Sequence, residues 1–145
     1  MKRSIELSGA DFDAEDFLEA WRNVFTRNLP MLERVRALKK AGGHRLILFS
    51  NTNSLHDPWI FEEFPELDQF DGKVLSYEVG AMKPAPAIYE YAIREFSLDP
   101  ASTLYIDDLA ENIAAGERYG FRCHLYRLDD HAAFETWLAR ELEKA

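Results

Sequence analysis

The chain has 145 residues, of which 47% are hydrophobic and 30% are charged, and its formal net charge is −9. This length suits one domain with a sizeable core, and the composition is typical of a globular protein. The acidic balance argues against a nucleic-acid-binding surface, which needs clustered Lys and Arg. The single Cys123 excludes an intrachain disulfide and any multi-cysteine metal site, which favours a reducing compartment.

No segment of the sequence predicts a membrane span or a secretory signal. The longest apolar run, Leu46 to Phe49, is far too short to cross a bilayer. The first residues are basic but lack the apolar stretch of a signal peptide. We therefore expect a cytoplasmic protein without a membrane partner.

The predicted elements alternate between helices and strands. Helices are expected where apolar residues recur at helical spacing, and strands where short apolar runs lie between turn signals. In chain order these are a helix over 13–28, a helix over 31–43, strands over 45–50 and 73–77, a helix over 87–96, a strand over 103–107, a helix over 110–120, a strand over 122–126 and a helix over 132–145. Such alternation predicts an α/β fold with a mostly parallel sheet covered by helices, in one domain over 1–145.

Polar side chains follow three of the predicted strands. Ligands bind beyond the carboxyl ends of the strands in sheets of this kind. Ser50 and Asn51 end the first strand, Lys83 lies in a turn after the second, and Asp107-Asp108 end the third, with Asn112 in the following helix. Their shared edge makes them candidates for one site.

Each of these signals also has a plain structural explanation. Adjacent carboxylates at the end of a buried strand repel each other, which a divalent cation such as Mg²⁺ would relieve, but Asp108 would equally serve as a helix cap. Lys83 alone is typical of a solvated surface, although helix starts attract anions. Ser50 and Asn51 would also suit a strand-to-loop exit. Only the joint arrangement favours a functional site.

The segments "LILFSNTN", "GAMKPAPAIYEYA" and "LYIDDLAENIAAGERYGF" together resemble motifs II, III and IV of the haloacid dehalogenase-like (HAD-like) hydrolases. They are most similar to the branch that contains glucose-1-phosphate phosphatase and the phosphatase domain of soluble epoxide hydrolase. The resemblance runs from about Phe17 to the end of the chain. It implies a Rossmann-like three-layer sandwich and Mg²⁺-dependent phosphoryl transfer through an aspartyl-phosphate.

The resemblance also implies roles for individual residues. Ser50 and Asn51 would bind the transferring phosphoryl group, and Lys83 would neutralise charge on nucleophile and phosphate. Asp108 would bind the metal with Asp107 beside it, directly or through water, and Asn112 would orient this loop. This division of labour agrees with the chemistry of phosphoryl transfer, which is mostly positioning and charge neutralisation.

The family's first motif, a buried strand that ends in Asp-x-Asp, has no clear counterpart. Asp11 and Asp13 have the right spacing, but Ile5 and Leu7 alternate with polar residues and do not adjoin the pair. Asp13 with Asp16 is instead typical of a helix start with an acidic first turn. We therefore expect that the pair is a helix start and that the nucleophile is not in this chain.

The expected domain is consequently a family fold without its first central strand and most of its helical cap. Residues 1–28 would be a remnant of the cap, and 29–145 the Rossmann-like core. The strands over 45–50 and 103–107 would then pair directly, or leave two open edges that a second copy or a separate fragment fills. An upstream extension of the chain is the third alternative.

Two functions of different classes follow. The first is a phosphatase that acts on a small phosphorylated metabolite, with Lys83 and Asp108 as catalytic residues. The second is an inactive remnant that acts as a binding or interaction protein, with Mg²⁺ bound weakly or not at all. A dehalogenase, which dispenses with magnesium, is disfavoured by Asp107-Asp108.

Overall fold

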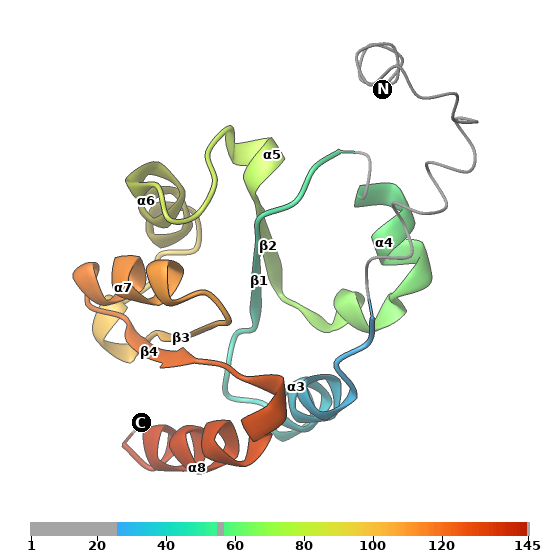
Figure 1. The fold of residues 1–145 in the computed structure, drawn as a ribbon, viewed down its shortest axis with the longest axis vertical. Coiled ribbons are helices and arrows are strands. Elements are labelled where there is room, and N and C mark those ends of the chain that lie inside the picture. The colour runs from blue at the N-terminus through green and yellow to red at the C-terminus, as the bar shows by residue number, and fades with distance from the viewer. Residues whose placement is uncertain (1–25, 55–56, 145) are drawn as a thin grey trace.

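The computed structural model describes residues 26–54 and 57–144 of the chain (Figure 1). Asp11, Asp13 and most of the predicted helix over 13–28 lie outside these residues. The described elements are α3 (Leu29–Ala41), β1 (Ile47–Ser50), α4 (Asp57–Glu63), η1 (Pro65–Gln69), β2 (Gly72–Leu75), α5 (Ser76–Val79), α6 (Pro86–Glu95), η2 (Pro100–Ser102), β3 (Leu104–Asp107), α7 (Ala110–Arg118), β4 (Arg122–Leu125), η3 (Leu128–Asp130) and α8 (His131–Leu142).

The strands form two separate parallel pairs. β1 pairs with β2 in a register that places Ile47 opposite Gly72, and β3 pairs with β4 so that Leu104 lies opposite Arg122. Among the described residues no strand connects β1 to β3, so the alternative of direct pairing does not occur. The predicted parallel α/β architecture is confirmed, with open edges on both strand pairs.

Helices cover both faces of β3, which explains its apolar run from Leu104 to Ile106. On one face Tyr105 of β3 packs with Ile88 and Tyr89 of α6 and Ile113 of α7. On the other face Leu104 and Ile106 pack against the cluster formed by α8. Because successive strand side chains point to opposite faces, β3 contributes to both layers.

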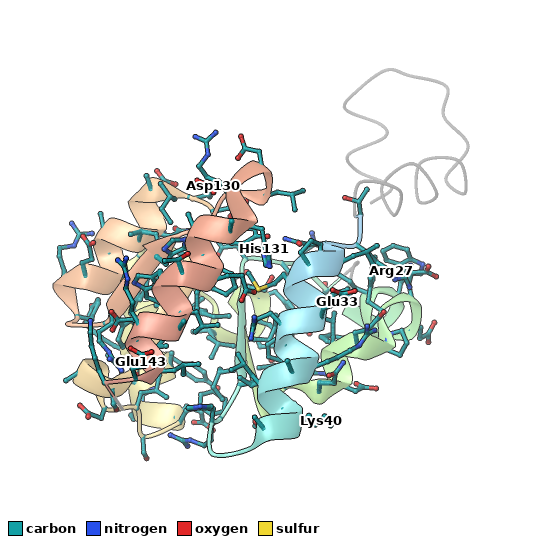
Figure 2. All side chains as sticks on the ribbon, turned by 90° about the horizontal axis from the view of Figure 1, so that it is seen from below. Arg27, Glu33, Lys40, Asp130, His131 and Glu143 are labelled. Atoms are coloured by element: carbon teal, nitrogen blue, oxygen red, sulfur yellow. The ribbon has the colours of Figure 1, made fainter. Side chains whose placement is uncertain are left out.

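α3 and α8 lie side by side on the second face, as both views show (Figures 1 and 2). α3 begins at Leu29, where the Asn28 side chain accepts a hydrogen bond from the backbone of Met31. Asn28 also donates to the Tyr126 hydroxyl (3.1 Å), and Arg34 forms an ion pair with Glu135 of α8. These polar contacts fix the start of α3 beside the end of β4. No helix among the described residues is long and apolar enough to cross a membrane.

The short helix α5 replaces the end of a predicted strand. The strand predicted over 73–77 ends at Leu75, and Ser76 begins the single turn of α5. The Ser76 hydroxyl accepts a hydrogen bond from Thr52 N and donates to Thr52 O, which bends the chain out of the sheet. Gly80, with φ 72°, ends the turn. The contacts of Ser76 with Thr52 thus link the start of the loop that carries Lys83 to the segment after β1.

Gly116 in α7 allows this helix to lie close to β3. A Cβ atom at this position would lie 2.6 Å from Cδ1 of Tyr105 and 3.1 Å from Sγ of Cys123. We expect Gly116→Ala to lower the free energy of unfolding by about 1–2 kcal/mol, because overpacking outweighs the roughly 1 kcal/mol gained in helix propensity. Urea unfolding measures this. The exposed Ala114→Gly on the same helix calibrates the propensity, and a stabilised Gly116→Ala would contradict the close approach.

Candidate active site

The loop that carries Lys83 is fastened to the end of β1 by a reciprocal pair of hydrogen bonds. The backbone N–H of Lys83 donates to Oδ1 of Asn51 (2.8 Å), and Nδ2 of Asn51 donates to the backbone carbonyl of Lys83 (2.9 Å). Both ends of the Asn51 amide are therefore engaged by this loop. The predicted phosphate-binding role of the Asn51 side chain stays a prediction, and its observed contact is with the protein backbone.

The ammonium group of Lys83 links β1 to β3. Nζ donates to the backbone carbonyl of Phe49 (2.7 Å) and to Oδ2 of Asp107 (2.6 Å). The side chains of Lys83 and Asp107 are only 8% and 4% exposed, so this is a buried ion pair. The ammonium group has three hydrogens, and these two acceptors leave one for a further partner.

Asp107 accepts four hydrogen bonds, which fill its lone-pair positions. Oδ2 accepts from Nζ of Lys83 and from the Tyr105 hydroxyl (2.8 Å), and Oδ1 accepts from Leu109 N and from Nδ2 of Asn112, both at 2.9 Å. Burial raises the pKa of this carboxyl, but the contacts with Lys83, Leu109 and Asn112 outweigh it and hold the pKa below its usual value. Asp107 is therefore ionised at neutral pH.

The negative charge of Asp107 is thus neutralised by the ammonium group of Lys83. The sequence suggested that a divalent cation or a helix cap would explain the acidic doublet. In the structure Lys83 neutralises Asp107, and Asp107, two residues before Leu109, accepts the backbone N–H at the start of α7. Asp108 is exposed. Its predicted metal-binding role stays a prediction.

A cavity of about 440 Å³ lies between β1 and β3 and brings part of the predicted site together. Lys83, Asp107 and Asp108 line it, together with Phe49 and Ile106 from the facing strands. The remaining lining residues are Asn28, Met31, Tyr126 and Leu128. Ser50 ends β1 and Asn51 follows it, but neither lines the cavity. Asn112 lies beneath Asp107, buried, where its contact with the carboxylate fits the predicted orienting role.

Two residues that lie beside the candidate site were not singled out from the sequence. Tyr105 lies two residues before Asp107 on β3, so strand alternation places both on the same face, and this signal could have identified it. Tyr126 follows β4 and lines the cavity, where its hydroxyl contacts Asn28 and Nδ1 of His131. No local signal marked Tyr126, because its contact with Asn28 joins segments that are far apart in the sequence.

The described residues offer an incomplete donor set for magnesium, which prefers six oxygen ligands in an octahedral arrangement. Within 26–54 and 57–144 no group of three or more His, Cys, Asp or Glu side chains could hold a metal ion. Asp107 has no free lone pair, which leaves the carboxylate of Asp108 as the available acidic ligand beside the cavity. A Mg²⁺ ion bound to Asp108 would complete its coordination with water, phosphate or other oxygen ligands.

Comparison with known proteins identifies relatives for this arrangement. A family model for haloacid dehalogenase-like hydrolases matches residues 11–120. D-ribitol-5-phosphate phosphatase of Bacteroides thetaiotaomicron is 33% identical over 123 residues, which cover 80% of this chain and 59% of that protein. Bifunctional epoxide hydrolase 2 of Rattus norvegicus is 32% identical over 120 residues, which cover 81% of this chain and 21% of the relative.

Solved structures agree with the sequence relatives. A HAD-family enzyme from Bacteroides thetaiotaomicron, crystallised as an Asp-to-Ala mutant with magnesium and inorganic phosphate, has a TM-score of 0.70 and 26% identity, covering 86% of this chain and 66% of that chain. The solved structure of a HAD-like family hydrolase from Porphyromonas gingivalis has a TM-score of 0.78 at 23% identity, and the match covers 94% of this chain and 70% of that chain. This similarity supports the fold.

The amine and the carboxylates lie at or beyond the strand ends of a parallel α/β fold, which is where ligands bind in sheets of this kind. The chain belongs to the haloacid dehalogenase-like hydrolase family. The resemblance noted in the three sequence motifs is confirmed. The chain spans 59% of the length of the phosphatase it matches and 21% of the epoxide hydrolase.

Proposed function

We propose that the chain is a phosphatase that acts on a small phosphorylated metabolite by Mg²⁺-dependent transfer through an aspartyl-phosphate. The family and the phosphatase relative support the reaction class. The observation that carries the proposal is Lys83, whose buried ammonium group borders the cavity and keeps one hydrogen for an anionic oxygen. Phosphoryl transfer depends on such fixed positive charge.

The residues divide the work in this proposal as follows. Lys83 neutralises the phosphoryl oxygens, Ser50 contributes a hydroxyl at the end of β1, and Asp107 holds Lys83 in place. Asp108 supplies one carboxylate to Mg²⁺, whose remaining ligands lie beyond the described residues. A bound Mg²⁺ ion would add positive charge against the phosphoryl group.

The nucleophilic aspartate is assigned to a strand between β1 and β3, outside the described residues. The cavity and the two open edges support this placement, because an inserted strand would pair with both neighbours. In this position its carboxyl end would face Lys83. The strand would come from a second copy, a separate fragment or a longer form of the chain.

Hydrolysis of p-nitrophenyl phosphate with Mg²⁺ and calorimetric titration with inorganic phosphate test the proposal together. We expect phosphate binding by the wild-type chain, and Mg²⁺-dependent turnover when the nucleophile strand is supplied. Asp108→Asn should reduce that turnover at least about 100-fold by removing a metal ligand. The matched control is Asp129→Asn, which removes an exposed surface carboxylate that pairs with Arg127. Unchanged turnover in Asp108→Asn would reject the role of this residue.

The same experiment addresses the second function, an inactive binding protein. The observation that favours it is the lack of an aspartate other than Asp107 and Asp108 beside the cavity, among the described residues. Phosphate binding without turnover, with the strand supplied, would support a binding role. Absence of both phosphate binding and turnover would reject the phosphatase function and a phosphate-binding role.

A further inference from the structure

Tyr105 is a buried residue of β3 whose hydroxyl contacts the ion pair of the site. The residue is 6% exposed, and its hydroxyl donates to Oδ2 of Asp107 at 2.8 Å. The same oxygen accepts from Nζ of Lys83 at 2.6 Å. A neutral donor and a cation therefore share one carboxylate oxygen, from two different directions.

The hydrogen-bond network assigns the single hydroxyl hydrogen of Tyr105 to Asp107. The one competing partner among the described residues is the Tyr89 hydroxyl, 3.5 Å away. Tyr89 uses its own hydrogen to donate to the backbone carbonyl of Asn112 (2.9 Å). The shorter distance and the negative charge both favour Asp107 as the acceptor. Burial also raises the pKa of Tyr105, so the hydroxyl keeps its hydrogen.

The ring of Tyr105 is held in place by other aromatic rings and by the backbone of α7. Its centroid lies 5.7 Å from that of Phe49, 6.0 Å from that of Tyr89 in an edge-to-face contact, and 6.0 Å from that of Phe121. Gly116 closes the fourth side. A hydroxyl on such a ring has little freedom, so it can fix the carboxylate that it contacts.

We propose that Tyr105 is a positioning residue: its hydroxyl fixes the Asp107 carboxylate, which in turn directs the free hydrogen of Lys83 toward the cavity. The inference about Lys83 and its ligand rests on the proposed phosphatase function. The inference that Tyr105 fixes the positions of Asp107 and Lys83 does not depend on that function. Without the hydroxyl, Oδ2 keeps only the Lys83 contact, and the carboxylate is held less firmly by its three remaining donors. The ammonium group then follows its strongest acceptor and loses its fixed direction.

The test compares two tyrosine-to-phenylalanine variants that differ in what the hydroxyl contacts. Tyr105→Phe keeps the packed ring and removes the donor to Asp107. Tyr89→Phe, its matched control, removes an equally buried hydroxyl that donates to a backbone carbonyl. Both substitutions retain the aromatic ring, and circular dichroism verifies that each variant is folded.

The first measurement is hydrogen exchange of the Lys83 ammonium group, followed by ¹⁵N NMR. We expect exchange in Tyr105→Phe to be about 10-fold faster than in wild type, because the ammonium group spends more time away from its acceptors. Exchange in Tyr89→Phe should stay within about 2-fold of wild type on the same reasoning. Equal rates in all three proteins would overturn the positioning role. Equal acceleration in both variants would also overturn it, because the effect would then come from any lost buried hydroxyl.

The second measurement is binding of inorganic phosphate by calorimetry, which addresses the ligand. We expect a dissociation constant about 5-fold weaker in Tyr105→Phe and unchanged in Tyr89→Phe, in line with the loss of preorganisation of a charged donor. Faster exchange with unchanged phosphate affinity would overturn the link between Tyr105 and the ligand. Absence of phosphate binding in wild type would reject the proposed function instead, and the exchange rates would still decide the geometry.

Discussion

Replacing Lys83 with methionine is expected to lower the free energy of unfolding by about 3–5 kcal/mol, a large share of the stability of a domain of this size. The substitution leaves the Asp107 carboxylate buried without its counter-charge, while the methionine occupies much of the volume of the lysine chain. The side chains involved are 8% and 4% exposed, so little water is available to replace the ammonium group beside Asp107. Urea unfolding at pH 7 measures the loss.

Two controls make this expectation specific. Lys39→Met removes the cation of an exposed ion pair with Asp71, and it should leave the unfolding free energy nearly unchanged. The double variant Lys83→Met with Asp107→Asn removes both charges, and it should be more stable than Lys83→Met alone. A Lys83→Met protein as stable as Lys39→Met would show that Asp107 does not depend on Lys83.

The two adjacent aspartates are expected to respond very differently to the same substitution. Asp107→Asn should cost about 3–5 kcal/mol at pH 7, because it leaves the Lys83 ammonium group buried without a counter-charge. Asp108→Asn should stay within about 0.5 kcal/mol, because Asp108 is exposed. Each of the two variants is the matched control for the other, because the chemical change is identical and the two positions are adjacent. Equal losses in the two variants would contradict the observed division between them.

The cost of Asp107→Asn should also depend on pH in a definite direction. The pKa of Asp107 is lowered in the folded protein, after burial is outweighed by Lys83, Leu109 and Asn112. A lowered folded pKa gives a stabilisation that is fully present above the unfolded value of about 3.9, and that is lost as pH falls through the folded value. The gap between wild type and Asp107→Asn should therefore be constant from pH 5 to 7 and shrink below about pH 4. A gap that widened on acidification would contradict this.

The α/β architecture could be predicted because it depends on patterns that lie within single segments. β3 is apolar at Leu104 and Ile106, which face α8, and at Tyr105, which faces α6, and this double burial gives the continuous run. The shorter elements carried no such signal. α5 has four residues, too few for a helical period, and it depends on the distant contact between Ser76 and Thr52.

The candidate site could be predicted as a set of residues but not as a set of contacts. Strand ends place Lys83, Asp107 and Asp108 at one edge, which follows from topology alone. Which cation neutralises which carboxylate depends on side-chain directions over distances of a few ångströms. The sequence therefore left a metal ion and a helix cap as alternatives, while the structure pairs Asp107 with Lys83. The same limit applies to Asn51, whose amide binds the Lys83 backbone.

The two parallel strand pairs have a consequence for how the protein behaves in concentrated solution. β1 and β3 each pair with one strand in the described part of the chain, so the other edge of each has no strand partner there, although the Phe49 carbonyl of β1 accepts from Lys83. Such strands act as templates for aggregation or strand exchange between molecules. A strand that covered them would lie beside Lys83, so the same event that prevents self-association would also change the surroundings of the amine for which we propose phosphate binding.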